Sequence, residues 1–193
     1  MKSLFIIILF FCISPCFPQD STNSVFVKEV KWSITMPANF ELVDDSVQNK
    51  LNKNGAKMIE EVNGVDINLS ETKNLFSAHN GSNIIYSTIT PFNVKKDGSY
   101  SKANRQVKAM LYKTFVEKIP KAQIDSSTST VTIDEQLFEK FTIEISDHKR
   151  HIMTMCLIYK LYRGYDFGIT YLYMNDWAQM AIEKAIFESK FGK

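Results

Sequence analysis

Strict alternation of hydrophobic and polar residues recurs along the chain and predicts its strands. Residues in strands place every second side chain on the same face, so this period is typical of half-buried strands. In the first such segment Trp32 and Ile34 alternate with polar residues, and Pro37 ends the pattern. The dipeptide Asn80-Gly81 favours a tight hairpin between the second and third segments. The predicted strands cover residues 25–36, 74–79, 84–90, 137–145, 151–162 and 165–173.

A second period, close to 3.6 residues, predicts three helices. The first begins at the N-cap Ser46 and ends at Gly64, with an apolar face of Val47, Leu51, Met58, Ile59 and Val62. The second runs over residues 101–119 up to Pro120, with an apolar face of Val107, Met110, Leu111, Thr114 and Phe115. The third runs over residues 177–189 after an Asn175 or Asp176 cap, with a stripe of Ala178, Ala181, Ile182, Ala185 and Ile186.

The order of these elements predicts the fold class. Strands joined by short turns must pair antiparallel, because a parallel crossover needs a dozen or more residues. The polar run Asp125 to Thr130 reads as a loop. We therefore expect an α+β fold in which about three helices cover a mainly antiparallel sheet. We expect it to be a single domain over residues 20–193.

The N-terminus predicts export. Lys2 precedes an unbroken apolar run at residues 4–13, and two prolines follow before Asp20. Ten apolar residues span about 15 Å as a helix, half of a hydrocarbon core of about 30 Å. We therefore predict a signal peptide over residues 1–19, no integral membrane span in the mature form, and a periplasmic or secreted protein. A lipoprotein acylated at Cys16 is the less favoured alternative, because Pro15 stands where a small residue is preferred.

Charge and cysteine content exclude further classes. The 23 basic and 21 acidic residues leave the chain near neutral, so it lacks the basic excess that nucleic acids attract. Removal of residues 1–19 leaves Cys156 as the one thiol, so no intramolecular disulfide can form. Cys156 lies in an apolar strand, and we expect it to be buried and unreactive.

The sequence lacks the motifs of common catalytic sites. It contains no G-x-S-x-G, no G-x-G-x-x-G and no phosphate-binding P-loop. Asp147, His148 and His151 could ligate zinc, but they lie at a predicted hairpin tip beside Lys149 and Arg150, so we interpret them as solvated. We accordingly predict no catalytic residue, no metal and no cofactor.

Tyrosines are concentrated in two predicted neighbouring strands. A tyrosine combines an apolar ring with a polar tip, which suits a binding surface as well as packing beneath a helix. The candidate binding surface consists of Tyr159, Tyr162, Tyr171 and Tyr173, with His148 and His151 second.

Both ends of the mature chain resemble PsbP-like domains. The opening Ser33 to Phe40 is a strand running into a proline and an aromatic residue. The ending has a long hairpin, Asn175-Asp176-Trp177 and a terminal helix that finishes near Phe191. The PsbP-like superfamily includes bacterial envelope proteins of the DcrB type. The resemblance implies an α/β/α sandwich that serves as an accessory or binding scaffold, and it transfers no catalytic residue.

These observations favour an exported, non-enzymatic accessory protein that binds a protein or small ligand in the envelope. Two alternatives stay open. One is a hydrolase-type enzyme with an unrecognised active site, and the other is a toxin-neutralising immunity protein.

Overall fold

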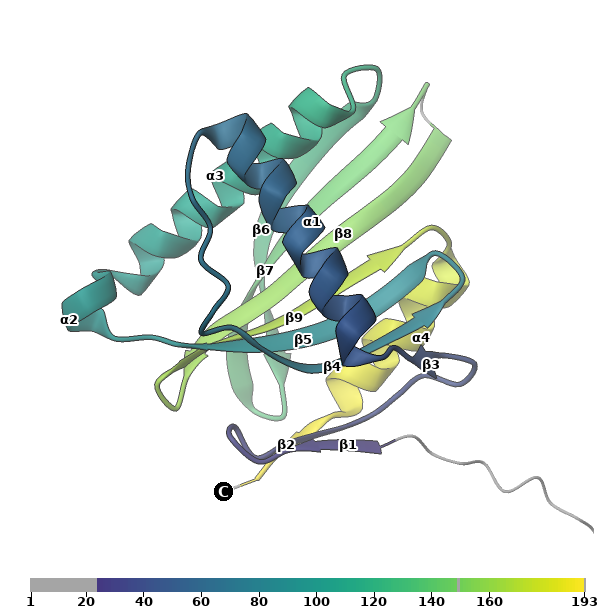
Figure 1. Cartoon of the computed structure of the whole chain (residues 1–193). Coiled ribbons are helices and arrows are strands. Elements are labelled where there is room, and N and C mark those ends of the chain that lie inside the picture. Colours follow the sequence, from purple (N-terminus) through teal and green to yellow (C-terminus); the bar gives the residue numbers. More distant parts are fainter. Residues whose placement is uncertain (1–23, 149, 193) are drawn as a thin grey trace, which may run out of the picture.

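A computed structural model describes residues 24–148 and 150–192 of the chain (Figure 1). The predicted signal peptide and the Cys16 lipidation site lie outside these residues. The large sheet is antiparallel, with strand order β3-β4-β5-β9-β8-β7-β6. Its strands are β3 (Glu41–Leu42), β4 (Lys73–Asn80), β5 (Asn83–Pro91), β6 (Gln123–Ile133), β7 (Gln136–Asp147), β8 (Arg150–Tyr162) and β9 (Tyr165–Tyr173).

A small antiparallel sheet joins the two ends of the described chain. It consists of β1 (Ser24–Val27), β2 (Trp32–Thr35) and β10 (Lys190–Phe191), with β2 in the centre. The helices are α1 (Asp45–Asn63), the single-turn α2 (Val94–Asp97), α3 (Tyr100–Lys118) and α4 (Asp176–Glu188). The predicted α+β class with a mainly antiparallel sheet is confirmed.

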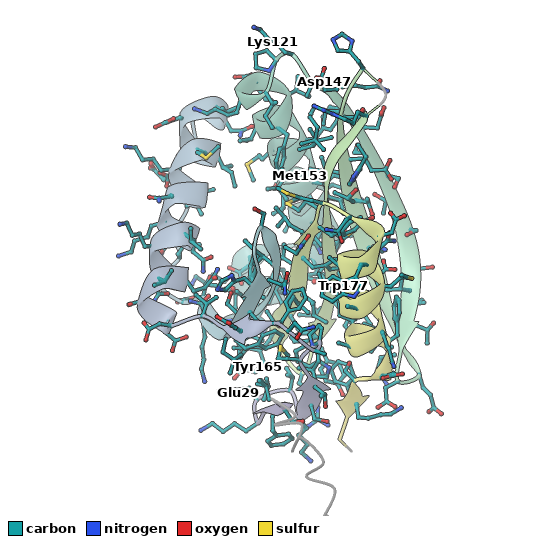
Figure 2. The ribbon with its side chains drawn as sticks, turned by 90° about the vertical axis from the view of Figure 1, so that its right-hand side faces the viewer. Glu29, Lys121, Asp147, Met153, Tyr165 and Trp177 are labelled. Carbon is teal, nitrogen blue, oxygen red and sulfur yellow. The ribbon has the colours of Figure 1, made fainter. Side chains whose placement is uncertain are left out.

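The elements form three layers. Figures 1 and 2 show α1 and α3 on one face of the large sheet, with α4 and the small sheet on the other. We call these faces the α1 face and the α4 face. Because side chains alternate along a strand, β9 presents Thr170 and Leu172 to the α1 face and Ile169 and Tyr171 to the α4 face.

Each face has its own apolar core. On the α4 face, Trp32 lies among Phe76, Phe167 and Phe191, and its Nε1 donates to Ser189 Oγ at 2.8 Å. The core beneath α3 is smaller and consists of Phe141, Ile143, Ile145, Met155 and Tyr159.

Several predicted elements are confirmed. The strands predicted over 137–145, 151–162 and 165–173 are β7, β8 and β9, and Arg163-Gly164 forms the turn between the last two. Asn175 caps α4, whose Ala178, Ile182 and Ile186 are buried as the stripe predicts. Gly64 ends α1 in the left-handed conformation, at φ 64°.

Local features of three other elements were predicted wrongly. Residues 25–36 form the hairpin β1–β2 rather than one strand, because residues 28–31 turn the chain. The Asn80-Gly81 hairpin exists, but Asn80 ends β4 and pairs with Asn83, so the turn residues are Gly81 and Ser82. Asp44, not Ser46, caps α1, since its side chain accepts from the Ser46 backbone N–H at 2.7 Å.

One further error concerns a strand that was predicted as a loop, and another concerns the buried side of helices. The polar run Asp125 to Thr130 was predicted as a loop, but it lies inside β6, an eleven-residue strand at the edge of the sheet. No described helix covers these residues, so a strand can form there without apolar side chains. The apolar face predicted for α1 is wrong in its first part, since Val47, Leu51 and Met58 are exposed, whereas Ile59 and Val62 are partly buried. Val107 of α3 is also exposed, although Thr114 of the same stripe is buried.

No helix within the described residues is long and apolar enough to cross a membrane.

Candidate functional site

The side of α1 that faces the sheet is polar. Gln48 is the buried residue of α1, with 3% of its surface exposed. Its Nε2 donates to Asn52 Oδ1 at 2.8 Å, and Asn52 Nδ2 donates to Asn74 Oδ1 of β4 at 2.8 Å. Asn74 Nδ2 in turn donates to Asn49 Oδ1 at 2.7 Å. A chain of amides therefore joins the first half of α1 to the sheet where apolar packing would be usual.

The second half of α1 is held by α3, again through polar contacts. Asn63 Nδ2 donates to Thr114 Oγ1 at 3.1 Å and to the carbonyl oxygen of Ile59 at 2.9 Å. The Lys118 ammonium lies 2.8 Å from the Glu61 carboxylate. The helix is thus tied at its two ends, to β4 and to α3.

The sheet beneath α1 is polar as well. Strand pairing places Ser77, Tyr86 and Thr170 in one row across β4, β5 and β9 on the α1 face. The next row contains Asn74 and Thr88. Along β5, the residues on the α4 face are buried, whereas those on the α1 face keep partial exposure. Solvent therefore reaches this part of the α1 face.

A carboxyl group lies at the end of the same strip, one row further along β9. The Tyr100 hydroxyl of α3 donates to Asp166 Oδ1 at 2.7 Å. Burial raises the pKa of the Asp166 carboxyl, and the hydrogen bond from Tyr100 only partly offsets this effect. Burial and the adjacent Asp166 raise the pKa of the Tyr100 hydroxyl, so this phenol keeps its proton at neutral pH.

Three buried polar atoms on this side of the sheet lack a hydrogen-bond partner among the described residues. They are Gln48 Oε1, Ser77 Oγ and Asn104 Nδ2, on residues with 3%, 3% and 8% of their surface exposed. The Asn104 side chain lies near the Tyr100 hydroxyl, but its nitrogen makes no hydrogen bond of normal geometry. A buried polar group without a partner costs about 1–3 kcal/mol, which makes three of them noteworthy.

We call this set of groups the polar layer. It comprises Gln48 and Asn52 of α1, Asn74 and Ser77 of β4, Tyr86 and Thr88 of β5, Tyr100 and Asn104 of α3, and Thr170 and Asp166 of β9. Its chemistry consists of amides, hydroxyls and one carboxyl group. Such groups bind by donating and accepting hydrogen bonds in fixed directions.

A hydrogen-bonded network on the α4 face is the second cluster with unusual chemistry. Glu183 of α4 accepts from Tyr171 at 2.8 Å and from Lys140 at 2.9 Å. Burial of the Glu183 carboxyl opposes its ionisation, but these two hydrogen bonds outweigh burial and lower its pKa. Burial alone would lower the pKa of Lys140, but the hydrogen bond to Glu183 and nearby negative charges raise it. The network therefore holds a stable ion pair beneath α4.

Cys156 lies in this network but lacks the features of a nucleophile. Burial raises the pKa of its thiol, and the neighbouring Tyr171, Lys140 and Thr142 only partly offset this. A reactive cysteine needs the opposite shift. The prediction that Cys156 is buried is confirmed, at 1% exposure.

The residues of the predicted binding surface lie in different places. Tyr159 and Tyr171 are both buried, but on opposite faces: the Tyr159 hydroxyl donates to Glu139 on the α1 face, whereas Tyr171 lies on the α4 face. Tyr162 pairs with Tyr165 at one end of the sheet, and Figure 2 places Tyr165 far from Asp147 at the opposite end.

Tyr173 and the two histidines lie toward the end of the sheet that contains Asp147. His151 stacks on Tyr173 with ring centroids 6.0 Å apart, and its Nε2 lies 2.9 Å from Thr154 Oγ1. The His148 side chain is almost fully exposed at the hairpin tip. Within the described ranges, no three potential metal ligands from His, Cys, Asp and Glu gather in one place.

A groove of about 940 Å³ lies between residues 33–40 and α4. Trp177 of α4 stacks on Phe40 there, with ring centroids 6.4 Å apart. None of the three unpartnered buried atoms comes from a residue that lines this groove. The polar layer is therefore the better candidate for a site that recognises a small molecule.

No family model matches the chain, and no curated protein matches it either.

The polar layer is not among the sites predicted from the sequence. One signal was available, because Gln48 and Asn52 lie four residues apart, which places them on one side of a helix. The contributions of Ser77 and Asp166 had no such signal, since isolated polar residues in strands usually face solvent.

Proposed function

We propose that this protein is a non-enzymatic binding protein that takes a small, uncharged, hydroxyl-bearing molecule into the polar layer. The observation that carries the proposal is the set of three buried, unpartnered polar atoms from α1, β4 and α3. A ligand that hydrogen-bonds to them would remove their desolvation cost, and this recovered free energy would favour binding.

The chemistry of the polar layer selects the class of ligand. Gln48 Oε1 can only accept, Asn104 Nδ2 can only donate, and Ser77 Oγ can do both. A hydroxyl group also donates and accepts, so the hydroxyls of a neutral sugar or another polyol can pair with each kind of atom. An anion is disfavoured, because Asp166 would repel it once ionised.

The test uses a matched pair of buried serines. Ser77→Ala removes an unpartnered hydroxyl, whereas Ser87→Ala removes a hydroxyl on the α4 face that donates to the Gly168 carbonyl at 2.7 Å. The probes are neutral mono- and disaccharides, with affinity measured by isothermal titration calorimetry. We expect Ser77→Ala to weaken binding about five- to ten-fold without any loss of stability, because the hydroxyl that it removes has no hydrogen-bond partner among the described residues, and Ser87→Ala to lower stability at unchanged affinity.

Two outcomes would overturn the proposal. One is that no sugar of the panel binds wild-type protein at millimolar concentration. The other is that Ser77→Ala binds a sugar as tightly as wild type, which would leave the polar layer without a role in recognition.

The alternative of a hydrolase would depend on Asp166. Its raised pKa and its position beside the Tyr100 hydroxyl are features of a general acid. A screen for hydrolysis of glycoside and ester substrates separates the two functions. Turnover that Asp166→Asn abolishes would establish the enzyme and remove the non-enzymatic proposal.

Export to the envelope is part of the same proposal, and it rests on the apolar run at residues 4–13. Membership of the PsbP-like superfamily likewise stays a prediction. Intact-mass measurement on protein from its native host should show loss of the first 16 to 19 residues. Retention of Met1 would contradict export, and a diacylglycerol mass on Cys16 would identify a lipoprotein.

A further inference from the structure

The outer edge of β6 is long and regular. β6 pairs with β7 through eleven consecutive residues, from Gln123 opposite Ser146 to Ile133 opposite Gln136, without a bulge. No other described strand pairs with β6, which is the last strand of the large sheet. Residues 125–130 are exposed on both faces of the strand. Alternate backbone N–H and C=O groups of β6 therefore point outward, as in any edge strand.

This edge lacks the usual protection against pairing. Proteins usually blunt an edge with a short strand, a bulge, a proline or a lysine. The opposite edge of the sheet is β3, which has two residues. The β6 sequence QIDSSTSTVTI contains no proline and no lysine, and Asp125 is its one charged residue.

We propose that two copies of this chain associate through β6, antiparallel to each other, so that their large sheets become continuous. The sequence of β6 is complementary to itself. Around a twofold axis at Thr128, Ser126 lies opposite Thr130 of the second copy and Asp125 lies opposite Val131. Hydroxyl residues then face each other and the two carboxylates do not, which favours this pairing.

Two exposed apolar residues lie on α4, on the same side of the sheet as the proposed junction. Met180 and Phe187 of α4 are 65% and 40% exposed. Helical spacing places them on the same side of α4 as Glu183, which contacts Lys140 of β7. The contact with Lys140 places Glu183 on the β7 side of α4, and Met180 and Phe187 lie next to it on the solvent side of the helix, away from the buried Ile182 and Ile186. A twofold axis perpendicular to the sheet keeps both α4 helices on the same face, where they would flank the junction.

The proposal does not depend on the polar layer, which lies over β4, β5 and β9.

The test of the proposed dimer uses opposite charges at the centre of β6. In Thr128→Lys the two new ammonium groups face each other, and Thr128→Glu has the same effect with carboxylates. Each variant should dissociate about ten-fold more readily than wild type in sedimentation equilibrium. An equimolar mixture should restore a dimer that contains one copy of each variant, as native mass spectrometry can show.

Ser70→Lys is the control, because it adds the same charge at an exposed loop residue far along the chain from β6. It should dimerise as wild type does. A monomeric wild type at submillimolar concentration would overturn the proposal. Full dimerisation of both Thr128 variants would overturn it too, since the interface would then lie elsewhere.

Discussion

At the scale of single residues, Cys156 shows how burial controls reactivity. The thiol is buried and its pKa is raised, so the thiolate fraction at neutral pH is small. We predict little labelling of Cys156 by a thiol reagent in native protein and complete labelling after unfolding. Mass spectrometry of alkylated protein measures both. Rapid labelling of the native protein would show that this site opens to solvent and would restore a redox or nucleophilic role.

Asp166 gives a prediction about pH at the same scale. Because burial raises its pKa in the folded protein, the folded state favours the protonated form, and ionisation above the folded pKa costs stability. Asp166→Asn removes this cost and keeps an acceptor for the Tyr100 hydroxyl. The difference in unfolding free energy, variant minus wild type, should therefore become more positive as pH rises from about 4 to 7.

Urea denaturation at several pH values measures this difference. Its sign is the critical result. A variant that loses stability relative to wild type with rising pH would mean that the folded protein favours the carboxylate, in contradiction to the burial of Asp166.

At the scale of elements, α1 and α4 differ in how they are attached. α4 buries Ile182 completely, whereas α1 exposes Leu51 by 48% and is held by amides and ion pairs. We predict that Ile182→Ala lowers the unfolding free energy by about 2–5 kcal/mol, and that Leu51→Ala changes it by less than about 0.5 kcal/mol. Chemical denaturation measures both values. Comparable losses in the two variants would show that α1 packs through its apolar side.

β6 is the element that sequence patterns misassigned. Its six central residues are polar, which is typical of a loop. A strand at the edge of a sheet needs only backbone pairing on one side, and β7 supplies it over the whole length of β6. The strand therefore forms without the alternation that marks β7, β8 and β9.

At the scale of the whole molecule, the N-terminal and C-terminal segments close the fold together. β10 pairs with β2, and Phe191 stacks on Trp32 with ring centroids 6.0 Å apart. We predict that Phe191→Ala lowers the unfolding free energy by about 3 kcal/mol, because the ring also contacts Phe138 and Phe167.

Phe26→Ala is the matched control, since Phe26 lies in β1 of the same small sheet and its ring is exposed. It should change the unfolding free energy by less than about 0.5 kcal/mol. Equal stability of the two variants would mean that the C-terminal strand adds nothing to the core.

The sequence by itself determined the central and C-terminal strands, the hairpin at Asn80, the helices α3 and α4, and the antiparallel class of the sheet. These features follow from local periodicity. An element that packs on one side has apolar residues at the period of a strand or of a helix, and this period can be read from the sequence. Tertiary structure alone decided that the amides of α1 face inward, that Ser77 and Asp166 share a layer with them, and that β6 is an edge strand. Those outcomes depend on which distant segments meet. The sequence around a polar residue is the same whether its side chain bonds to water or to another part of the chain, so the sequence does not tell the two cases apart.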